Sequence, residues 1–200
     1  MALKRKVQLL AKSMGSKTLV PVSDTIIADV TKASTKQDST NSKFIEEALK
    51  HAVQMNALGI TSKELENICE VMHDFRVLGA SFLPMDITKY LMAKEYSQDK
   101  EGLKTKWYES GLWYGTFFKE KFADPIEGFR NFLLVTRWDL NEVEATQNRD
   151  TVKLRCISNI LSLQDTELLV KFIDGVMHGL GYRVEKIDYV KGIAAVEYKK

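Results

Sequence analysis

The side chains that most often do chemistry are sparse and scattered in this sequence. His178 lies one helical turn after Asp174, a spacing that could orient an imidazole as a general base but is equally typical of a surface pair. Cys69 and His73 are also one turn apart, which supplies two metal ligands where a structural zinc site needs four. The third histidine, His51, has no such neighbour. We therefore assign no catalytic residue and no metal ligand, and the sequence favours a protein that is not an enzyme.

Nucleotide and hydrolase motifs are missing as well. The 11 glycines form neither a phosphate-binding loop nor the dinucleotide fingerprint after a strand, and no G-x-S-x-G motif occurs. The sequence thus identifies no cofactor.

The most informative segment is 103–122, in which aromatic residues and glycines alternate. Gly111 and Gly115 lie one helical turn apart, so a helix here would carry a strip without side chains that lets another backbone or a flat apolar ligand approach. Each glycine costs about 1 kcal/mol relative to alanine, which some contact must offset. The same segment is dense in aromatic residues, among them Trp107, Tyr108, Trp113, Tyr114, Phe117 and Phe118.

This cluster is the candidate ligand site, although such a stripe is also typical of ordinary core. The hydroxyl of Tyr108 or Tyr114 could orient a ligand. The first wall of the expected pocket comprises Trp107, Gly111, Tyr114, Gly115 and Phe118. The second wall comprises Phe172, Val176 and Met177.

Composition bounds the kind of protein that positions these residues. The chain has 200 residues, of which 44% are hydrophobic and 28% charged, enough for a core without disulfides. A net charge of +2 excludes a strongly polybasic nucleic-acid binder. The apolar runs reach only about four residues, far below the roughly 20 of a membrane-spanning helix. Two cysteines fit a reducing compartment, so we expect a cytoplasmic protein.

The N-terminal residues 1–17 carry five basic residues and no acid. Polar residues interrupt the apolar stretch, which excludes a secretory signal. On a helix, Leu3, Val7, Leu10 and Met14 would form one stripe beside a cationic face. This stripe could dock on the rest of the protein, contact a membrane surface or contact an acidic partner.

The N-terminal half reads as an extended or looped segment at 18–30, a polar linker at 31–42 and then helices. We expect one helix from Lys43 to Gly59, a second from the capping box of Thr61 and Glu64 to Gly79, and a third after Pro84. The third helix should turn three residues inward: Ile87, Tyr90 and Leu91. A charged break at 97–102 should precede the aromatic helix.

The C-terminal half changes to a period of two. We expect strands at 131–138 and 151–157, joined as a hairpin with a turn at 147–150, then a helix capped by Asp165 and a hairpin of 183–190 with 193–198. This order predicts an α+β fold with helices packed on one antiparallel or mixed sheet. Residues 1–42 would form a basic arm and linker, and residues 43–200 the domain.

Residues 75–199 resemble the 4-vinyl reductase domain family of small-molecule-binding modules. The resemblance rests on the glycine-aromatic helix, the strand that runs to Cys156, Ser158 and Asn159, the Phe172-Ile173-Asp174-Gly175 segment with Gly179 and Gly181, and a last hairpin turning at Gly192. It implies an α/β plait related to Golgi transport-particle subunits and haem nitric-oxide sensor domains, and often a homodimer.

One departure from that family removes a chemical role. Many members have two cysteines around the last hairpin, whereas Tyr189 and Ala195 stand at these positions. We therefore carry over no zinc or thiol chemistry. The resemblance implies a non-catalytic binding module for a lipid-, aromatic- or tetrapyrrole-like molecule, or an assembly factor with the same fold.

A DNA-binding regulator is the alternative. Residues 48–72 have the helix, glycine turn and capped helix of a helix-turn-helix motif. Glu64 and Glu66 at the start of its second helix would face the phosphate backbone, and they argue against this function. The sequence identifies neither the ligand nor the pathway.

Overall fold

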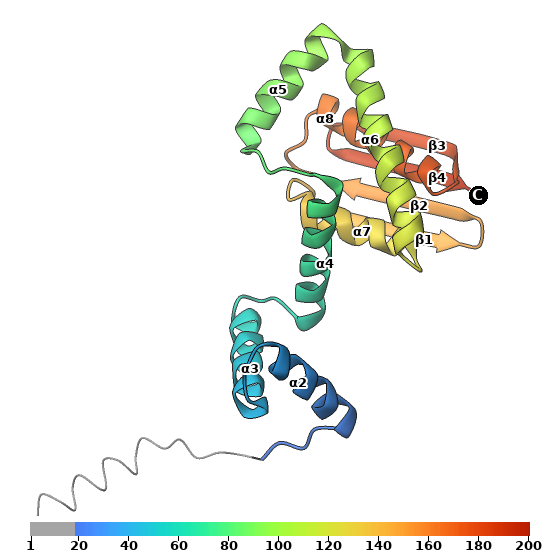
Figure 1. The fold of residues 1–200 in the computed structure, drawn as a ribbon. Helices are drawn as coiled ribbons and strands as arrows, with labels where there is room; N and C mark the ends of the chain where they lie inside the picture. Colours follow the sequence, from blue (N-terminus) through green and yellow to red (C-terminus); the bar gives the residue numbers. More distant parts are fainter. Residues whose placement is uncertain (1–18) are drawn as a thin grey trace, which may run out of the picture. The chain divides into compact units, whose positions relative to one another are not determined.

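A computed structural model describes residues 19–200 and divides the chain into two compact units, which meet between Ser62 and Lys63 (Figure 1). The predicted basic stripe within residues 1–17 lies outside the described residues. The division at residue 43 expected from composition stays a prediction.

The first unit contains two helices, α2 (Asp24–Lys36) and α3 (Asn41–Ala57), which pack on each other. The buried Ser34 donates a hydrogen bond to the Asn41 side chain at 2.7 Å, and Asn41 in turn donates to the hydroxyl of Thr31 at 2.8 Å. The predicted extended segment and polar linker were therefore wrong over residues 24–36. The reason is that these polar side chains hydrogen bond across the turn between the helices instead of remaining solvated.

The second unit combines five helices with a four-stranded antiparallel sheet, which confirms the α+β fold class (Figure 1). Its helices are α4 (Ser62–Leu78), α5 (Met85–Gln98), α6 (Lys100–Lys121), α7 (Pro125–Thr136) and α8 (Leu163–Gly179). Its strands are β1 (Glu142–Asn148), β2 (Thr151–Ile157), β3 (Arg183–Val190) and β4 (Ile193–Lys199).

The sheet has the order β1-β2-β4-β3, and one of its faces forms the core. Alternation places Val152, Leu154 and Cys156 of β2 on the buried face, as predicted. The neighbouring strand β4 adds Val196 and Tyr198, which are also buried. Burial raises the pKa of the Cys156 thiol to about 12, so this cysteine stays protonated at neutral pH.

Helix α8 forms where it was predicted, but it begins at Leu163 and its N-cap is Ser162 instead of Asp165. Ser162 and Asp165 form a capping box at its start, and its predicted apolar face is buried. Asp174 differs from the prediction, because it is only 8% exposed instead of lying on the water side. It accepts a hydrogen bond from the buried hydroxyl of Tyr198 at 3.4 Å.

The predicted strand at 131–138 was wrong, since residues up to Thr136 belong to helix α7. Asp124 caps this helix by accepting a hydrogen bond from the amide of Glu127, and Pro125 occupies its first turn. Phe129, Phe132 and Leu133 repeat with helical spacing and are buried. The hairpin partner of β2 is β1, with the predicted turn at 147–150 retained.

Helix α5 forms where it was expected but with a different face inward. Ile87, Tyr90 and Leu91 are 45%, 65% and 46% exposed, which corrects the predicted orientation. Thr88 and Met92 are partly buried instead. The expected break at 97–102 shrinks to Asp99, whose carboxylate caps α6 at the amide of Gly102. Among residues 19–200, none of the helices is long and apolar enough to cross a bilayer.

Candidate functional site

The bare strip on α6 is covered by helix α8. A Cβ atom added at Gly111 would lie 2.2 Å from the carbonyl oxygen of Phe172, and one added at Gly115 would lie 2.2 Å from the carbonyl oxygen of Val176. Gly175 and Gly179 complete the contact from α8. We expected either another backbone or a flat apolar ligand to lie against this strip. The structure places the backbone of α8 there, and no room is left for a flat ligand between these helices.

The predicted site residues are brought together, but mostly as core. Phe118, Val176 and Met177 are fully buried, and Phe172 is 7% exposed. The ring of Tyr114 packs edge-on against three phenylalanines: Phe118, Phe132 and Phe172. Burial raises the pKa of the Tyr114 hydroxyl. Ligand binding by these residues stays a prediction.

Trp107 is the predicted site residue that reaches an open cleft. The cleft has a volume of about 580 Å³, within the range typical of small-molecule sites. It lies between α5, the loop before it, the segment that joins α7 to β1, and the start of α8. Its apolar lining comprises Phe75, Phe82, Leu83, Pro84, Met85, Met92, Trp107, Trp138, Ile160, Leu161 and Leu168.

Local sequence signals shape this cleft. Gly79, with a φ of +72°, ends α4, and Pro84 begins α5, so the intervening residues form a short loop. The loop places the ring of Phe82 edge-on to Phe75 at 5.5 Å and nearly parallel to Trp138 at 6.2 Å. The indole nitrogen of Trp138 donates to the Val135 carbonyl at 2.7 Å, which fixes the indole at the end of α7.

Two aromatic rings on the cleft rim are largely exposed to water. Phe82 is 60% exposed and Trp138 is 76% exposed. Large apolar side chains that line a concave surface gain free energy when a ligand removes them from water, by roughly 25 cal/mol per Å². An apolar molecule that covered these two rings would therefore gain free energy.

An ion pair adds polar character to the cleft. The Nε and Nη2 atoms of Arg137 donate to both carboxylate oxygens of Asp139, at 2.8 and 2.7 Å. Partial burial raises the pKa of Asp139, but the hydrogen bonds and charge of Arg137, aided by Lys89, outweigh burial and hold that pKa below its usual range. Asp139 is therefore ionised at neutral pH.

Helix α5, one wall of the cleft, is anchored through Glu167 of α8. The Tyr96 hydroxyl donates to this carboxylate, and Lys100 and Lys104 form ion pairs with it at 3.1 and 3.4 Å. Burial alone would raise the pKa of Glu167, but hydrogen bonds from these three residues lower it to about 2. The anchor is thus charged at neutral pH.

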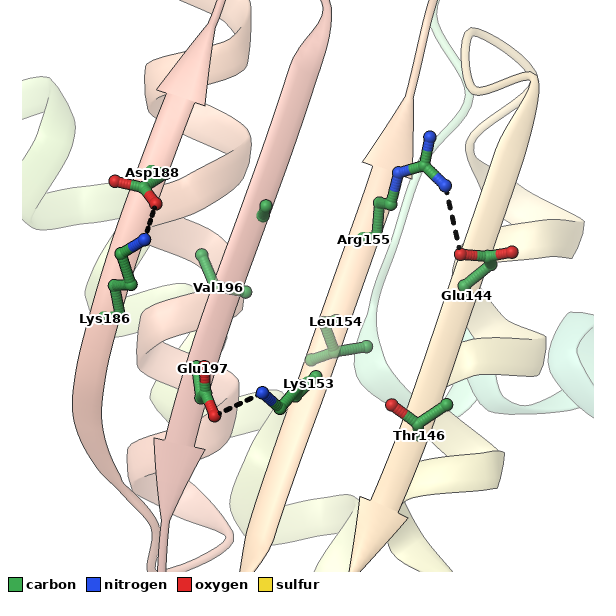
Figure 2. Close-up of a pocket in the computed structure, with 10 residues that line it drawn as sticks. Glu144, Thr146, Lys153, Leu154, Arg155, Lys186, Asp188, Val196 and Glu197 are labelled. Atoms are coloured by element: carbon green, nitrogen blue, oxygen red, sulfur yellow. Dashed lines mark hydrogen bonds and ion pairs between the residues drawn. The ribbon is translucent and has the colours of Figure 1, made fainter.

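The outward face of the sheet has a shallower hollow of about 330 Å³ (Figure 2). Its charged side chains pair with one another: Lys153 with Glu197 at 2.7 Å, and Arg155 with Glu144 at 3.3 Å. Lys186 also pairs with a neighbour on its own strand. Because these charges are already matched, this face offers a ligand less than the apolar cleft does.

His178 belongs to a network outside the cleft. Its Nδ1 lies 3.2 Å from the Tyr108 hydroxyl and 3.5 Å from the Asp174 carboxylate. Neither His73 nor Cys69 lines the cleft. Within residues 19–200, no three histidine, cysteine or acidic side chains gather as a metal site.

Sequence reasoning missed most of the cleft. Phe82 lies in the connection before helix α5. Met92 lies on α5, whose inward face was predicted wrongly, and Trp138 lies in the segment that was wrongly predicted as a strand. The available signal was Phe82-Leu83-Pro84, two bulky apolar residues in a connection too short to bury them.

Comparisons with known proteins are limited. No family model matches the chain, and no curated protein matches it, so the resemblance to the 4-vinyl reductase family stays a prediction. Similar solved structures include an oxygen-binding H-NOX domain related to soluble guanylate cyclases, which is 12% identical with a TM-score of 0.37 and covers 68% of this chain and 90% of its own.

Another similar structure comes from work on heme distortion in the H-NOX family. It is 12% identical with a TM-score of 0.39, and the match covers 64% of this chain and 81% of the other. Likeness at this level does not establish a shared ligand or activity.

Proposed function

We propose that this protein is a non-catalytic module that binds a hydrophobic small molecule in the cleft between α5 and the start of α8. The observation that carries the proposal is a concave surface of about 580 Å³ lined by the exposed rings of Phe82 and Trp138. The resemblance stated above supports the same class of function. Its finer points, the vinyl-reductase type, the homodimer and the cytoplasmic location, belong to this proposal.

A haem held by an axial histidine does not fit the cleft. The described residues that line it include neither histidine nor cysteine, and the ring of His178 faces Tyr108. We therefore favour an aromatic or lipid-like ligand over a haem that is ligated by histidine or cysteine.

Binding of a neutral dye tests the proposal. Phenylnaphthylamine fluoresces strongly when it leaves water, and we expect saturable binding to the intact protein. Trp138→Ala should weaken this binding about tenfold or more, because an indole contributes much of the apolar area available to a ligand. Dye fluorescence measured over a protein titration gives the affinity.

Trp113→Ala is the matched control. Trp113 is 62% exposed on α6, compared with 76% for Trp138, and it does not line the cleft. We expect its loss to leave the affinity unchanged. Equal weakening by the two substitutions, or no saturable binding at all, would reject the cleft as the site.

Extraction of the purified protein with organic solvent and mass spectrometry addresses the natural ligand. A compound that is present in the wild type but reduced in Trp138→Ala would support a carrier or sensor. An assembly role would leave both proteins without a bound compound.

The helix-turn-helix alternative stays a prediction. The helices concerned are α3 and α4, which belong to different compact units. Loss of DNA binding as salt is raised would be its signature, and an absence of DNA binding at low ionic strength would remove it.

A further inference from the structure

The charged side chains that line the cleft differ in how many hydrogen bonds and ion pairs they already form. Asp165 accepts hydrogen bonds from the amide and hydroxyl of Ser162, at 3.2 and 2.7 Å, and lies in the first turn of α8, where the helix dipole favours a carboxylate. Asp139 is held by Arg137 through two hydrogen bonds. Both carboxylates that line the cleft therefore already accept hydrogen bonds from the protein.

The two cations that line the cleft can still form an ion pair or a hydrogen bond with a ligand. Lys89 forms no ion pair within 4.0 Å among the described residues, and Nη1 of Arg137 makes no hydrogen bond to them. Lys89, Arg137 and Asp139 all line the same cleft, and the charge of each cation lowers the pKa of Asp139. This cluster of Lys89, Arg137 and Asp139 carries a net charge of +1, and Asp165, whose carboxylate is bound by Ser162, brings the sum over the four charged residues of the cleft to zero.

This cluster is placed to act on a bound molecule. The side chains of Arg137 and Asp139 are 21% and 17% exposed, so their charges are partly withdrawn from water and interact more strongly than at a free surface. Lys89 also lines an adjoining hollow of about 250 Å³, which shares Met92 and Ile160 with the cleft. Lys89 therefore lies beside apolar surface on two sides, and the carboxylate of Asp165 also lines both hollows.

We propose that the cleft selects an aromatic hydrophobe that carries one anionic group, such as a carboxylate or sulfonate. The anionic group would bind the ammonium of Lys89 and the free edge of the Arg137 guanidinium. The rings would lie against Phe82, Trp107 and Trp138, because aromatic side chains favour stacked or edge-on aromatic partners. This inference deepens the proposed function and depends on it.

Two dyes with the same rings separate charge from hydrophobicity. Anilinonaphthalene sulfonate carries a sulfonate that phenylnaphthylamine lacks. In the intact protein, Lys89→Met should weaken binding of the sulfonate about three- to tenfold, the range expected for one partly exposed charged contact, and leave the neutral dye unchanged. Added salt should weaken binding of the sulfonate dye and leave binding of the neutral dye unchanged.

Lys94→Met is the matched control. Lys94 also lies on α5, is exposed and forms no ion pair among the described residues, but it does not line the cleft. We expect no change with either dye. Equal effects of the two lysine substitutions on the sulfonate would overturn the proposed selectivity.

A second variant tests the cluster without removing a cation. Asp139→Asn should strengthen binding of the sulfonate several-fold, because it removes the carboxylate that competes for Arg137. If the neutral dye binds but neither Lys89→Met nor Asp139→Asn alters sulfonate binding, the selectivity fails while the proposed function stands. If neither dye binds the wild type, the proposed function fails.

Discussion

A Cβ atom on Gly115 of α6 would lie 2.2 Å from the carbonyl oxygen of Val176 on α8, so the backbones of these helices are in direct contact. The contact is reciprocal, since a Cβ atom on Gly175 would lie 2.1 Å from the carbonyl oxygen of Tyr108. Four glycines thus bring the central helix of the domain against α8, which covers the sheet. The contact between α6 and α8 therefore offsets the cost of having these glycines in helices.

Gly115→Ala should lower the free energy of unfolding by about 1–3 kcal/mol, the usual cost of overpacking. Alanine favours helix by about 1 kcal/mol over glycine, so a net loss requires that the steric clash dominate. Urea denaturation measures the change, and Gly115→Leu should be more damaging. Ser110→Ala, at an exposed position of the same helix, should be neutral or stabilising. A more stable Gly115→Ala protein would contradict the packing.

Lys121→Met should destabilise the domain by about 3–5 kcal/mol, because it leaves Asp74 without its cation. Asp74 is 1% exposed on α4, and the Lys121 side chain of α6 forms an ion pair with it and with Glu70. Thermal or chemical denaturation measures the loss.

The double variant Asp74→Asn with Lys121→Met provides the control for that ion pair. It removes both charges together, so it should be more stable than Lys121→Met alone. A double variant that is less stable by the sum of the two single changes would show that the two side chains do not interact.

Glu167→Gln should cost about 1–3 kcal/mol at neutral pH, the value of a hydrogen bond to a charged group. The pKa of Glu167 is about 2 in the folded protein, against an ordinary value of 4.5. Because the folded pKa is the lower one, its stabilisation is complete above pH 4.5 and is lost as the pH falls toward 2.

The measurement for Glu167 is the difference in stability between the wild type and Glu167→Gln across that window. We expect the difference to be constant from pH 7 to about pH 5 and to shrink below pH 4.5. A difference that stays constant down to pH 2 would mean that Glu167 does not anchor α5 through its charge.

Elements with a strong period and clear end signals could be predicted from the sequence. Helix α8 has an unbroken apolar face and a capping box, and β3 and β4 flank a turn at Gly192, where φ is +77°. Helix α7 was wrongly predicted as a strand, because the short apolar run of Phe132 to Val135 taken alone fits either structure. Its capping by Asp124 was the signal that separates them.

The candidate site was only partly predictable. Segment 103–122 was correctly expected to be a helix that packs closely against another surface, yet the spacing of glycines does not say whether that surface is protein or ligand. The cleft depends on which side of α5 faces inward, and its 14 residues carry apolar side chains on both sides. Only tertiary contacts such as that between Tyr96 and Glu167 decide the orientation.

Methyl resonances of labelled methionine report directly on whether an apolar molecule occupies the cleft. Met85 and Met92 line the cleft, whereas Met177 is fully buried among the originally predicted site residues and Met55 lies in α3. On titration with phenylnaphthylamine, we predict that Met85 and Met92 shift and that Met177 and Met55 do not. A shift of Met177 with the cleft methionines unmoved would contradict the account.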